Sequence, residues 1–185
     1  MKIKLASLLV VGICFFLPMS AWAGPATSNS LQVGLGFRYG IEMNDGDFNP
    51  WGTGLGASVG YTLPVMPIYV GGNFDYFFGS TLEAGPIRTK GNVWQFMAEG
   101  GYDVGLAEIL VLRPKLGLGP ATMSSEVCAS GSPCSSDSKT YFAIAPGAAV
   151  MLFTSVLKLS LDLRYDLIFA DTTAKALIIS AGIGF

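Results

Sequence analysis

The sequence predicts an all-β fold: an eight-stranded antiparallel up-and-down transmembrane β-barrel, preceded by a cleaved signal peptide. Three observations support this prediction. Eight segments alternate bulky apolar residues with small or polar ones, and a period of two is typical of β-strands with two different faces. The connections between these segments alternate in length. Although 51% of the residues are hydrophobic, no apolar run beyond the N-terminus reaches the roughly 20 residues of a membrane-spanning helix.

Each of the eight segments is long enough to cross a membrane as a barrel strand, which takes about 9–11 residues. The clearest is 157–169, where Leu157 begins a series of seven apolar residues and Lys158 begins the alternate, mainly polar series. The last segment divides in the same way, with bulky residues such as Ile183 on one parity and small ones such as Gly182 on the other. The expected strands cover residues 30–41, 54–63, 68–79, 91–104, 109–119, 140–153, 157–169 and 176–185.

The connections fall into two groups, long polar loops on one side and tight turns on the other. An even strand number with this division is typical of outer-membrane barrels. Lipid also requires a closed sheet, because an open edge would leave unpaired backbone groups in hydrocarbon. Both chain ends are then expected on the periplasmic side and the loops outside. The expected loops cover 42–53, 80–90, 120–139 and, shorter, 170–175; the expected turns lie near 64–67, 105–108 and 154–155.

A soluble eight-stranded barrel of lipocalin type is the alternative fold. It would turn its polar parity to water and its apolar parity to a ligand. Here the polar parity is rich in glycine and the apolar parity is bulky, which favours a lipid-facing exterior. Pro114 and Pro146 fall in mid-strand on the outward parity, where proline donates no ladder hydrogen bond, and a bulge is expected at each.

Residues 1–23 have the parts of a secretory signal peptide. Lys2 and Lys4 supply the positive start, 5–17 supply the apolar core, and the small residues at 21–23 supply an A-x-A cleavage site. A retained membrane anchor is the alternative, but the apolar core is too short for it. The sequence therefore predicts cleavage after Ala23, which leaves residues 24–185 as a single barrel domain.

Ten charged residues fall on the inward parity, five cations and five anions. Because an eight-stranded barrel is just wide enough for its side chains to fill it, we expect a self-neutralising network of ion pairs. The alternatives are a polar conduit or a catalytic carboxylate cluster. A turn centred near Leu106 would place Glu99 directly opposite Arg113. The network comprises Arg38, Asp75, Glu99, Asp103, Arg113, Lys115, Lys158, Asp162, Arg164 and Asp166.

Composition excludes several kinds of chemistry. The chain has no histidine, which removes His-ligated metals and His-based acid–base catalysis, so we expect no catalytic, metal or cofactor site. The net charge is −2, and without Lys2 and Lys4 it falls to about −4, so no basic surplus indicates nucleic acid.

Two cysteines, Cys128 and Cys134, lie in the expected loop 120–139. A secreted chain meets an oxidising periplasm, which favours a disulfide between them. Chain entropy gives a loop of this size a stabilisation of roughly 2–2.5 kcal/mol, so a structural clip is sufficient reason for the bond. A stiffened recognition loop and two free thiols are the alternatives.

Aromatic residues gather at two expected heights along the barrel. Trp51 and Trp94 are expected near the outer end, and Tyr61 and Tyr102 near the inner end. Two girdles at the membrane interfaces are the ordinary explanation. A sugar-binding use of Trp51 is the alternative.

The aromatic C-terminal residue, Phe185, ends a strand that resembles the closing strand of bacterial outer-membrane β-barrels. With the signal peptide and the eight alternating segments, the mature chain resembles the small Gram-negative barrels of the OmpA/OmpX type and their opacity-protein relatives. The resemblance implies that outer-membrane lipid and lipopolysaccharide surround the barrel. It also implies that the barrel assembly machinery recognises the last strand through Phe185.

This resemblance favours a non-enzymatic structural or surface-interaction protein, with an extracellular ligand held by the loops. Passive passage of small or hydrophobic molecules is the first alternative. A lipid-modifying enzyme is the second, but barrel enzymes of that kind rely on a histidine that this chain does not have.

Overall fold

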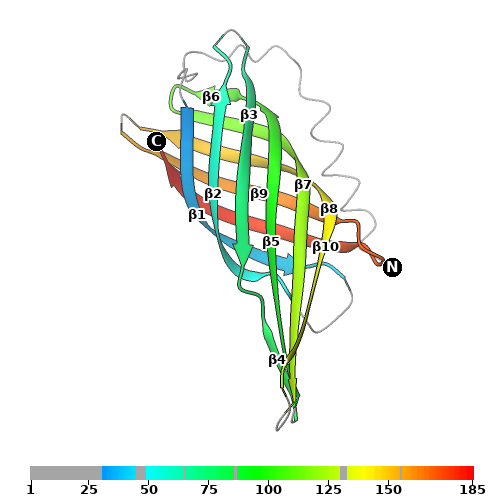
Figure 1. Cartoon of the computed structure of the whole chain (residues 1–185). Coiled ribbons are helices and arrows are strands. Elements are labelled where there is room, and N and C mark those ends of the chain that lie inside the picture. The colour runs from blue at the N-terminus through cyan, green and yellow to red at the C-terminus, as the bar shows by residue number, and fades with distance from the viewer. Residues whose placement is uncertain (1–30, 45–48, 65, 86, 130–132, 155) are drawn as a thin grey trace, which may run out of the picture.

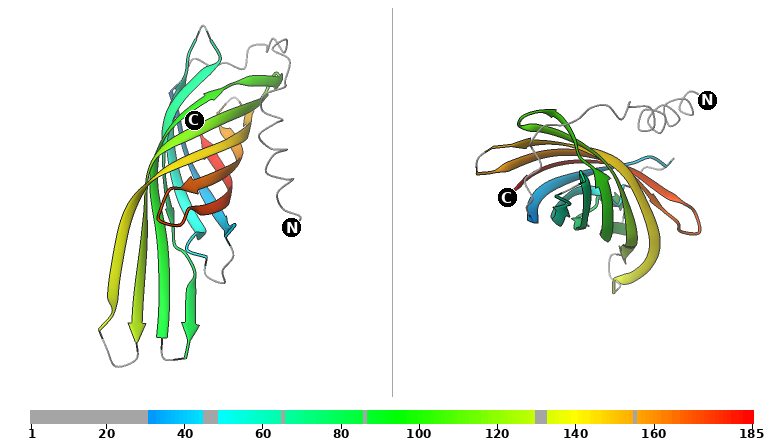
Figure 2. Two further views of the ribbon diagram at one scale, coloured as in Figure 1. Left: turned by 90° about the vertical axis from the view of Figure 1, so that its right-hand side faces the viewer. Right: turned by 90° about the horizontal axis from the view of Figure 1, so that it is seen from above.

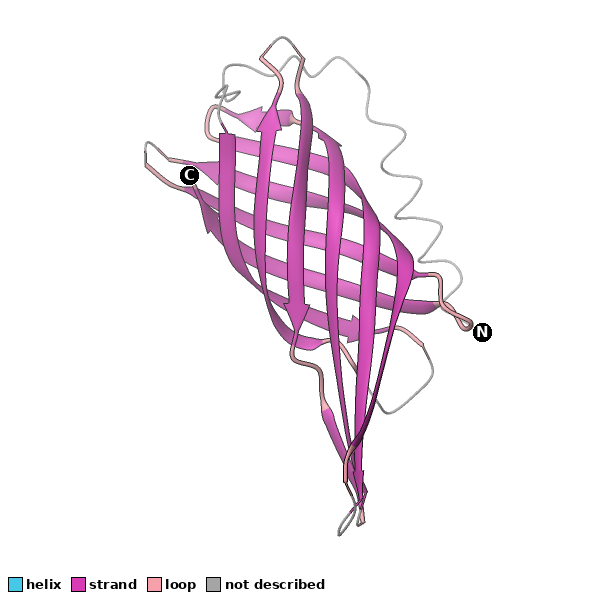
Figure 3. Ribbon diagram, in the orientation of Figure 1, coloured by secondary structure: helices cyan, strands magenta, loops and turns pink. Residues whose placement is uncertain are grey.

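The computed structural model describes residues 31–44, 49–64, 66–85, 87–129, 133–154 and 156–185, and the expected leader lies outside them. Strands make up nearly all of this part of the chain (Figures 1 and 3). The strands are β1 (Leu31–Glu42), β2 (Gly52–Thr62), β3 (Ile68–Phe77), β4 (Thr81–Ala84), β5 (Ile87–Tyr102), β6 (Val104–Ala107), β7 (Leu110–Ala129), β8 (Ser135–Phe153), β9 (Lys158–Ile168) and β10 (Ala174–Gly184).

These strands form one antiparallel sheet that closes on itself. The eight long strands pair in chain order, with β3 next to β5 and β5 next to β7, and β1 pairs with β10 to close the sheet. The short strand β4 follows β3 along one edge of β5, and the short strand β6 follows β5 along one edge of β7. Eight barrel positions result, which confirms the predicted eight-stranded up-and-down barrel. Within the described residues, no helix is long and apolar enough to span a membrane.

The two faces of the barrel differ as the alternation predicts. On β9, Leu161 and Leu163 are exposed on the outside, whereas Arg164 and Asp166 are buried inside. On β1, Phe37 is 74% exposed, as a residue facing lipid should be. The large apolar residues that are exposed therefore form the lipid-facing surface, and the polar parity fills the interior.

The tight turns, the start of β1 and the C-terminus lie together at one end of the barrel. Figure 1 shows the start of β1 and the C-terminus at this end, beside the turn that joins β2 to β3. The closing seam is completed by two backbone hydrogen bonds, Val33 N to Phe185 O and Phe185 N to Val33 O. This is the end that the sequence assigns to the periplasm.

At the other end, four strands continue beyond the barrel as a projecting sheet (Figure 2). We define the projecting sheet as β4, residues 87–92 of β5, 122–129 of β7 and 135–140 of β8. The expected long loops 80–90 and 120–139 are therefore wrong, because both are mostly strand. Paired hydroxyls stabilise this polar segment, as between Thr122 and Thr140 at 2.7 Å.

The prolines do not produce the expected bulges. The β8–β9 pairing omits Ala145 and Pro146, yet the register is the same on both sides of the omission. Pro114 lies in an unbroken β7–β8 register and opposite the place where β5 ends and β6 begins. A proline removes one hydrogen bond from the ladder without requiring an extra residue, so the strands stay aligned.

Candidate functional site: the lumen and the projecting sheet

The barrel interior contains all ten charged residues that the sequence assigns to it. Asp75 and Asp166 are fully buried, and Arg164 is only 2% exposed. Charges with so little access to water require close partners of opposite sign. The structure supplies these partners in two groups, a central one and one at the inner end.

The central group is organised around Arg164. Its guanidinium contacts Asp75 at 2.6 Å and Asp166 at 2.8 Å. Arg38 contacts the other oxygen of Asp75 at 2.9 Å, and Gln95 donates to Asp166 at 2.8 Å. Both buried carboxylates thus accept charge-assisted hydrogen bonds, which are the strong kind.

Lys115 extends the central group on β7, two strands away from Arg164 and level with it. Its Nζ lies 2.9 Å from Glu99 and 2.5 Å from Asp162, so one ammonium serves two carboxylates. Asn73 also donates to Glu99, at 2.6 Å.

At the inner end, Arg113 holds Asp103 through two parallel hydrogen bonds, at 2.5 and 2.9 Å. The same guanidinium lies over the ring of Tyr69, 3.7 Å from its centroid. The fork geometry and the aromatic face together explain why arginine suits this position better than lysine would.

The predicted pair between Glu99 and Arg113 is wrong. The register places Glu99 opposite Gly117, because the turn is centred near Glu108 rather than Leu106. A shift of the turn centre by two residues moves every partner by four, an even number. Both side chains therefore stay inside the barrel but acquire other partners, as described above.

The lumen contains five cations and five anions, but among the described residues one cation has no carboxylate partner. Lys158 donates to the amide oxygen of Gln32 at 3.0 Å, and within the described residues it forms no ion pair with a carboxylate. Arg113 donates to the same amide oxygen, at 3.2 Å.

The outer end of the lumen is closed by apolar side chains, which the sequence analysis did not anticipate. Trp51 is fully buried and packs edge-to-face on Phe77, with ring centroids 5.2 Å apart. The expected position of Trp51 in the outer girdle is therefore wrong. The signal in the sequence that could have predicted this closure is the set of apolar residues on the inward parity near the outer ends of the strands. This apolar cluster comprises Trp51, Phe77, Val93, Met97, Ala121, Ala143, Ala145, Ile168, Ala174, Ala176 and Ile178.

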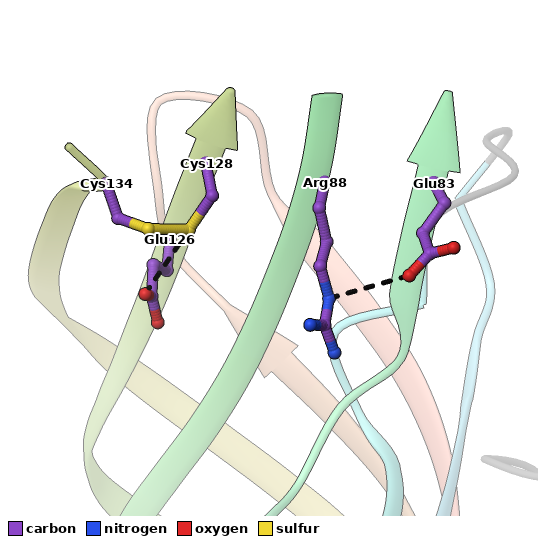
Figure 4. Close-up of a disulfide and its surroundings, with 5 residues drawn as sticks. All are labelled: Glu83, Arg88, Glu126, Cys128 and Cys134. Carbon is purple, nitrogen blue, oxygen red and sulfur yellow. Dashed lines mark hydrogen bonds and ion pairs between the residues drawn. A yellow bond between two sulfur atoms is a disulfide. The ribbon is translucent and has the colours of Figure 1, made fainter. Parts of the chain in front are cut away.

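The projecting sheet ends in the expected disulfide. Cys128 and Cys134 are bonded across the tip that joins β7 to β8 (Figure 4). Arg88 pairs with Cys128 across the strands and contacts Glu83 at 3.6 Å on the same face. This ion pair is largely exposed and contributes little stability. Because the two sulfurs are bonded to each other, neither is free to act as a thiolate ligand for a metal.

Comparison with known proteins identifies the family. The profile of the family described as "Outer membrane protein beta-barrel domain" matches residues 6–185. The chain belongs to this family. It is therefore a protein of the bacterial outer membrane, as the sequence predicts. No curated protein sequence matches the chain significantly.

Three solved structures of bacterial outer-membrane or surface proteins share the fold. The chain is similar to a major outer membrane protein of Thermus thermophilus (TM-score 0.62, 14% identity, 84% of this chain and 100% of that one). It is also similar to Ail, the attachment invasion locus protein of Yersinia pestis, in complex with the heparin analogue sucrose octasulfate (0.61, 19%, 84% and 97%). A third is Neisserial surface protein A (0.56, 16%, 83% and 94%). Identities this low establish the fold alone.

Within this outer-membrane barrel, Phe185 lies at the closing seam. Its side chain is 72% exposed, and its backbone pairs with Val33. It packs little against the protein itself, so the expected role in recognition by the assembly machinery stays a prediction.

Proposed function

We propose that this outer-membrane barrel is a non-enzymatic surface-interaction protein. The barrel serves as the anchor, with outer-membrane lipid and lipopolysaccharide around it, and the projecting sheet serves as the contact surface. One observation carries this proposal: four strands continue beyond the barrel as a paired sheet stiffened by a disulfide at its tip. Such a sheet presents a fixed surface to the outside without the entropy cost of ordering a loop on binding.

The edge formed by β8 is the best candidate for the contact itself. The β8–β9 ladder begins at Ala143, so within the described residues 135–141 have no strand partner on that side. Residues 135–140 are all exposed. An unpaired strand edge offers a row of backbone donors and acceptors, to which an extended segment of another protein can add.

The charge of the outer end bears on the kind of partner. Apart from the ten luminal charges, the expected leader and Glu108, the sequence has seven acidic and four basic residues. Five of these acidic residues and all four basic ones are described by the structure, and they lie at the outer strand ends and loops. The net negative charge of this part of the sequence favours neutral or basic protein partners and disfavours polyanions. Although Ail was solved with a heparin analogue, we therefore propose a protein ligand for this chain. The acidic residues are Glu42, Asp45, Asp47, Glu83, Glu126, Asp137 and Asp171; the basic ones are Arg88, Lys90, Lys139 and Lys175.

A truncated variant tests the proposal. Thr81 lies opposite Lys90, and Ser124 opposite Ser138, so an Asn-Gly turn can replace 82–89 and another can replace 125–137. Cells displaying the unmodified protein should bind surfaces coated with serum proteins or a basic protein better than surfaces coated with heparin. The truncated variant should lose this binding while keeping its heat-modifiable migration. The matched control replaces Leu106 with Ser, at an exposed position of β6 at the inner end.

Two further measurements address the alternatives. The lumen combines an apolar cluster with buried ion pairs, which supports little or no steady current in planar bilayers. A stable ion-selective current would favour passive passage instead. Altered lipid A in a deletion strain, restored by the unmodified gene, would favour an enzyme. Equal binding by truncated and unmodified protein would overturn the surface role.

A further inference from the structure

The inner end of the lumen carries a local excess of positive charge. Arg113 and Lys158 share the uncharged amide oxygen of Gln32, and Asp103 is bound to Arg113. Lys158 is only 9% exposed. Its ammonium has three donors and one protein acceptor among the described residues, whereas each of the other four luminal cations contacts a carboxylate.

Two small cavities meet beside Lys158. Their volumes are about 60 and 30 Å³, and they share four lining residues: Arg38, Ser58, Lys158 and Ser160. Two of these are cations and two are hydroxyls, so all four can donate a hydrogen bond into the same space. Within the described part of the chain, neither hydroxyl has a protein partner of its own.

Glycines on the neighbouring strands keep this space open. A Cβ atom at Gly34 would lie 2.9 Å from Ser58 Oγ, and one at Gly182 would lie 3.0 Å from Ser160 Oγ. Both distances are shorter than ordinary contacts, so a larger residue at either position would press on the hydroxyl. The room beside the donors therefore depends on glycine at these two positions.

We propose that Arg38, Ser58, Lys158 and Ser160 form a binding site for a small inorganic anion of the size of chloride. Preorganised donors and uncompensated positive charge in a water-poor interior favour an anion. The volumes suit a monatomic ion, since both are well below the roughly 150 Å³ cavity that holds benzene. The carboxylates Glu99 and Asp162 line only the larger cavity, and Lys115 contacts both.

Chloride itself is the probe for the test. The unfolding midpoint of the full barrel in lipid vesicles is measured in sodium chloride and in sodium gluconate, at equal ionic strength. A ligand that binds only the folded state raises the midpoint in proportion to its occupancy. The unmodified protein should unfold at a higher midpoint in chloride, and Lys158→Met should remove the difference. Exposed Lys175 is the matched control, and Lys175→Met should keep the difference unchanged.

A second variant keeps the test decisive if Lys158→Met does not fold. Combining Ser58→Ala with Ser160→Ala retains every charge and should weaken the apparent chloride affinity about a hundredfold or more, the loss expected for two hydroxyl donors to an ion. Crystals soaked in bromide should show an anomalous peak between Arg38 and Lys158. Equal midpoints in the two salts together with no bromide peak would show that the cavities hold water only, and would overturn the site. A loss of the chloride effect in Lys175→Met as large as in Lys158→Met would overturn it as well, because the effect would then be nonspecific.

Discussion

The two halves of the lumen are filled by opposite kinds of side chain. The central and inner part contains buried ion pairs, such as those of Arg164 with Asp75 and Asp166. The outer part contains Trp51, Phe77 and the rest of the apolar cluster. An ion pair in a dry interior must keep every partner, because removing one leaves an uncompensated charge. An apolar cluster only has to fill its volume. The two halves should therefore respond differently to substitutions of similar size.

The largest effect is expected at Arg164. Arg164→Met keeps most of the side-chain volume but leaves buried Asp75 with Arg38 and a long hydrogen bond from Gln95, at 3.4 Å, and leaves buried Asp166 with only Gln95. We expect a loss of about 3–5 kcal/mol in the free energy of unfolding. Urea titration of the protein in lipid vesicles measures it. Arg88→Met at the exposed ion pair is the matched control and should change the value by less than about 0.5 kcal/mol.

A smaller loss is expected at Glu99, whose partner is not left alone. In Glu99→Ala, Lys115 keeps Asp162 at 2.5 Å, although Asn73 loses its acceptor. We expect a loss of about 1–3 kcal/mol, the penalty for buried polar groups left unsatisfied. A double-mutant cycle identifies the partner: Glu99 should couple with Lys115 and not with Arg113. If Glu99 couples more strongly with Arg113 than with Lys115, the β5–β7 register is different from the one described.

Glu99 shows what the sequence could establish about the fold: its inward position could be predicted, but its partner could not. The side-chain period of two fixes which residues face inward, and that assignment survives an error in the turn, because a hairpin register changes by an even number when the turn centre moves by whole residues. All ten charged residues were therefore placed inside, but the pairing of Glu99 with Arg113 was wrong. Pairing depends on turn geometry at Glu108 and Ile109, where no glycine or proline marks the position.

The apolar cluster and the projecting sheet were missed for a related reason. Alternation distinguishes lipid from interior only within the membrane, so single apolar residues on the inward parity, such as Phe77 and Ile178, do not by themselves indicate a cluster. Beyond the membrane, both faces of a strand meet water, and a polar stretch such as 122–129 has the composition of a loop. Cross-strand pairing with β5 and β8 makes it a strand, and pairing is a tertiary property.

In the apolar half, a change that conserves volume should be tolerated. Met97 is fully buried in the cluster, and Met97→Leu replaces one flexible apolar side chain by another of similar size. We expect a change of less than about 1.5 kcal/mol in the same urea titration. A loss as large as that of Arg164→Met would remove the distinction between the two halves. The matched substitution Met151→Leu, at a buried position outside the cluster, shows whether the tolerance is general.

The smallest effect on the barrel is expected from the disulfide, which lies outside both halves. Replacing Cys128 and Cys134 with serine removes a link across the tip of the projecting sheet. Chain entropy assigns such a short loop roughly 2–2.5 kcal/mol, but this stabilisation belongs to the tip. We expect the projecting sheet to open while the barrel stays closed. The free energy of unfolding of the barrel should therefore change by less than about 0.5 kcal/mol. Hydrogen exchange should instead accelerate at residues 124–129 and 135–138 and stay slow in β9. Faster exchange in β9, or a shifted midpoint, would show that the projecting sheet and the barrel unfold as one unit.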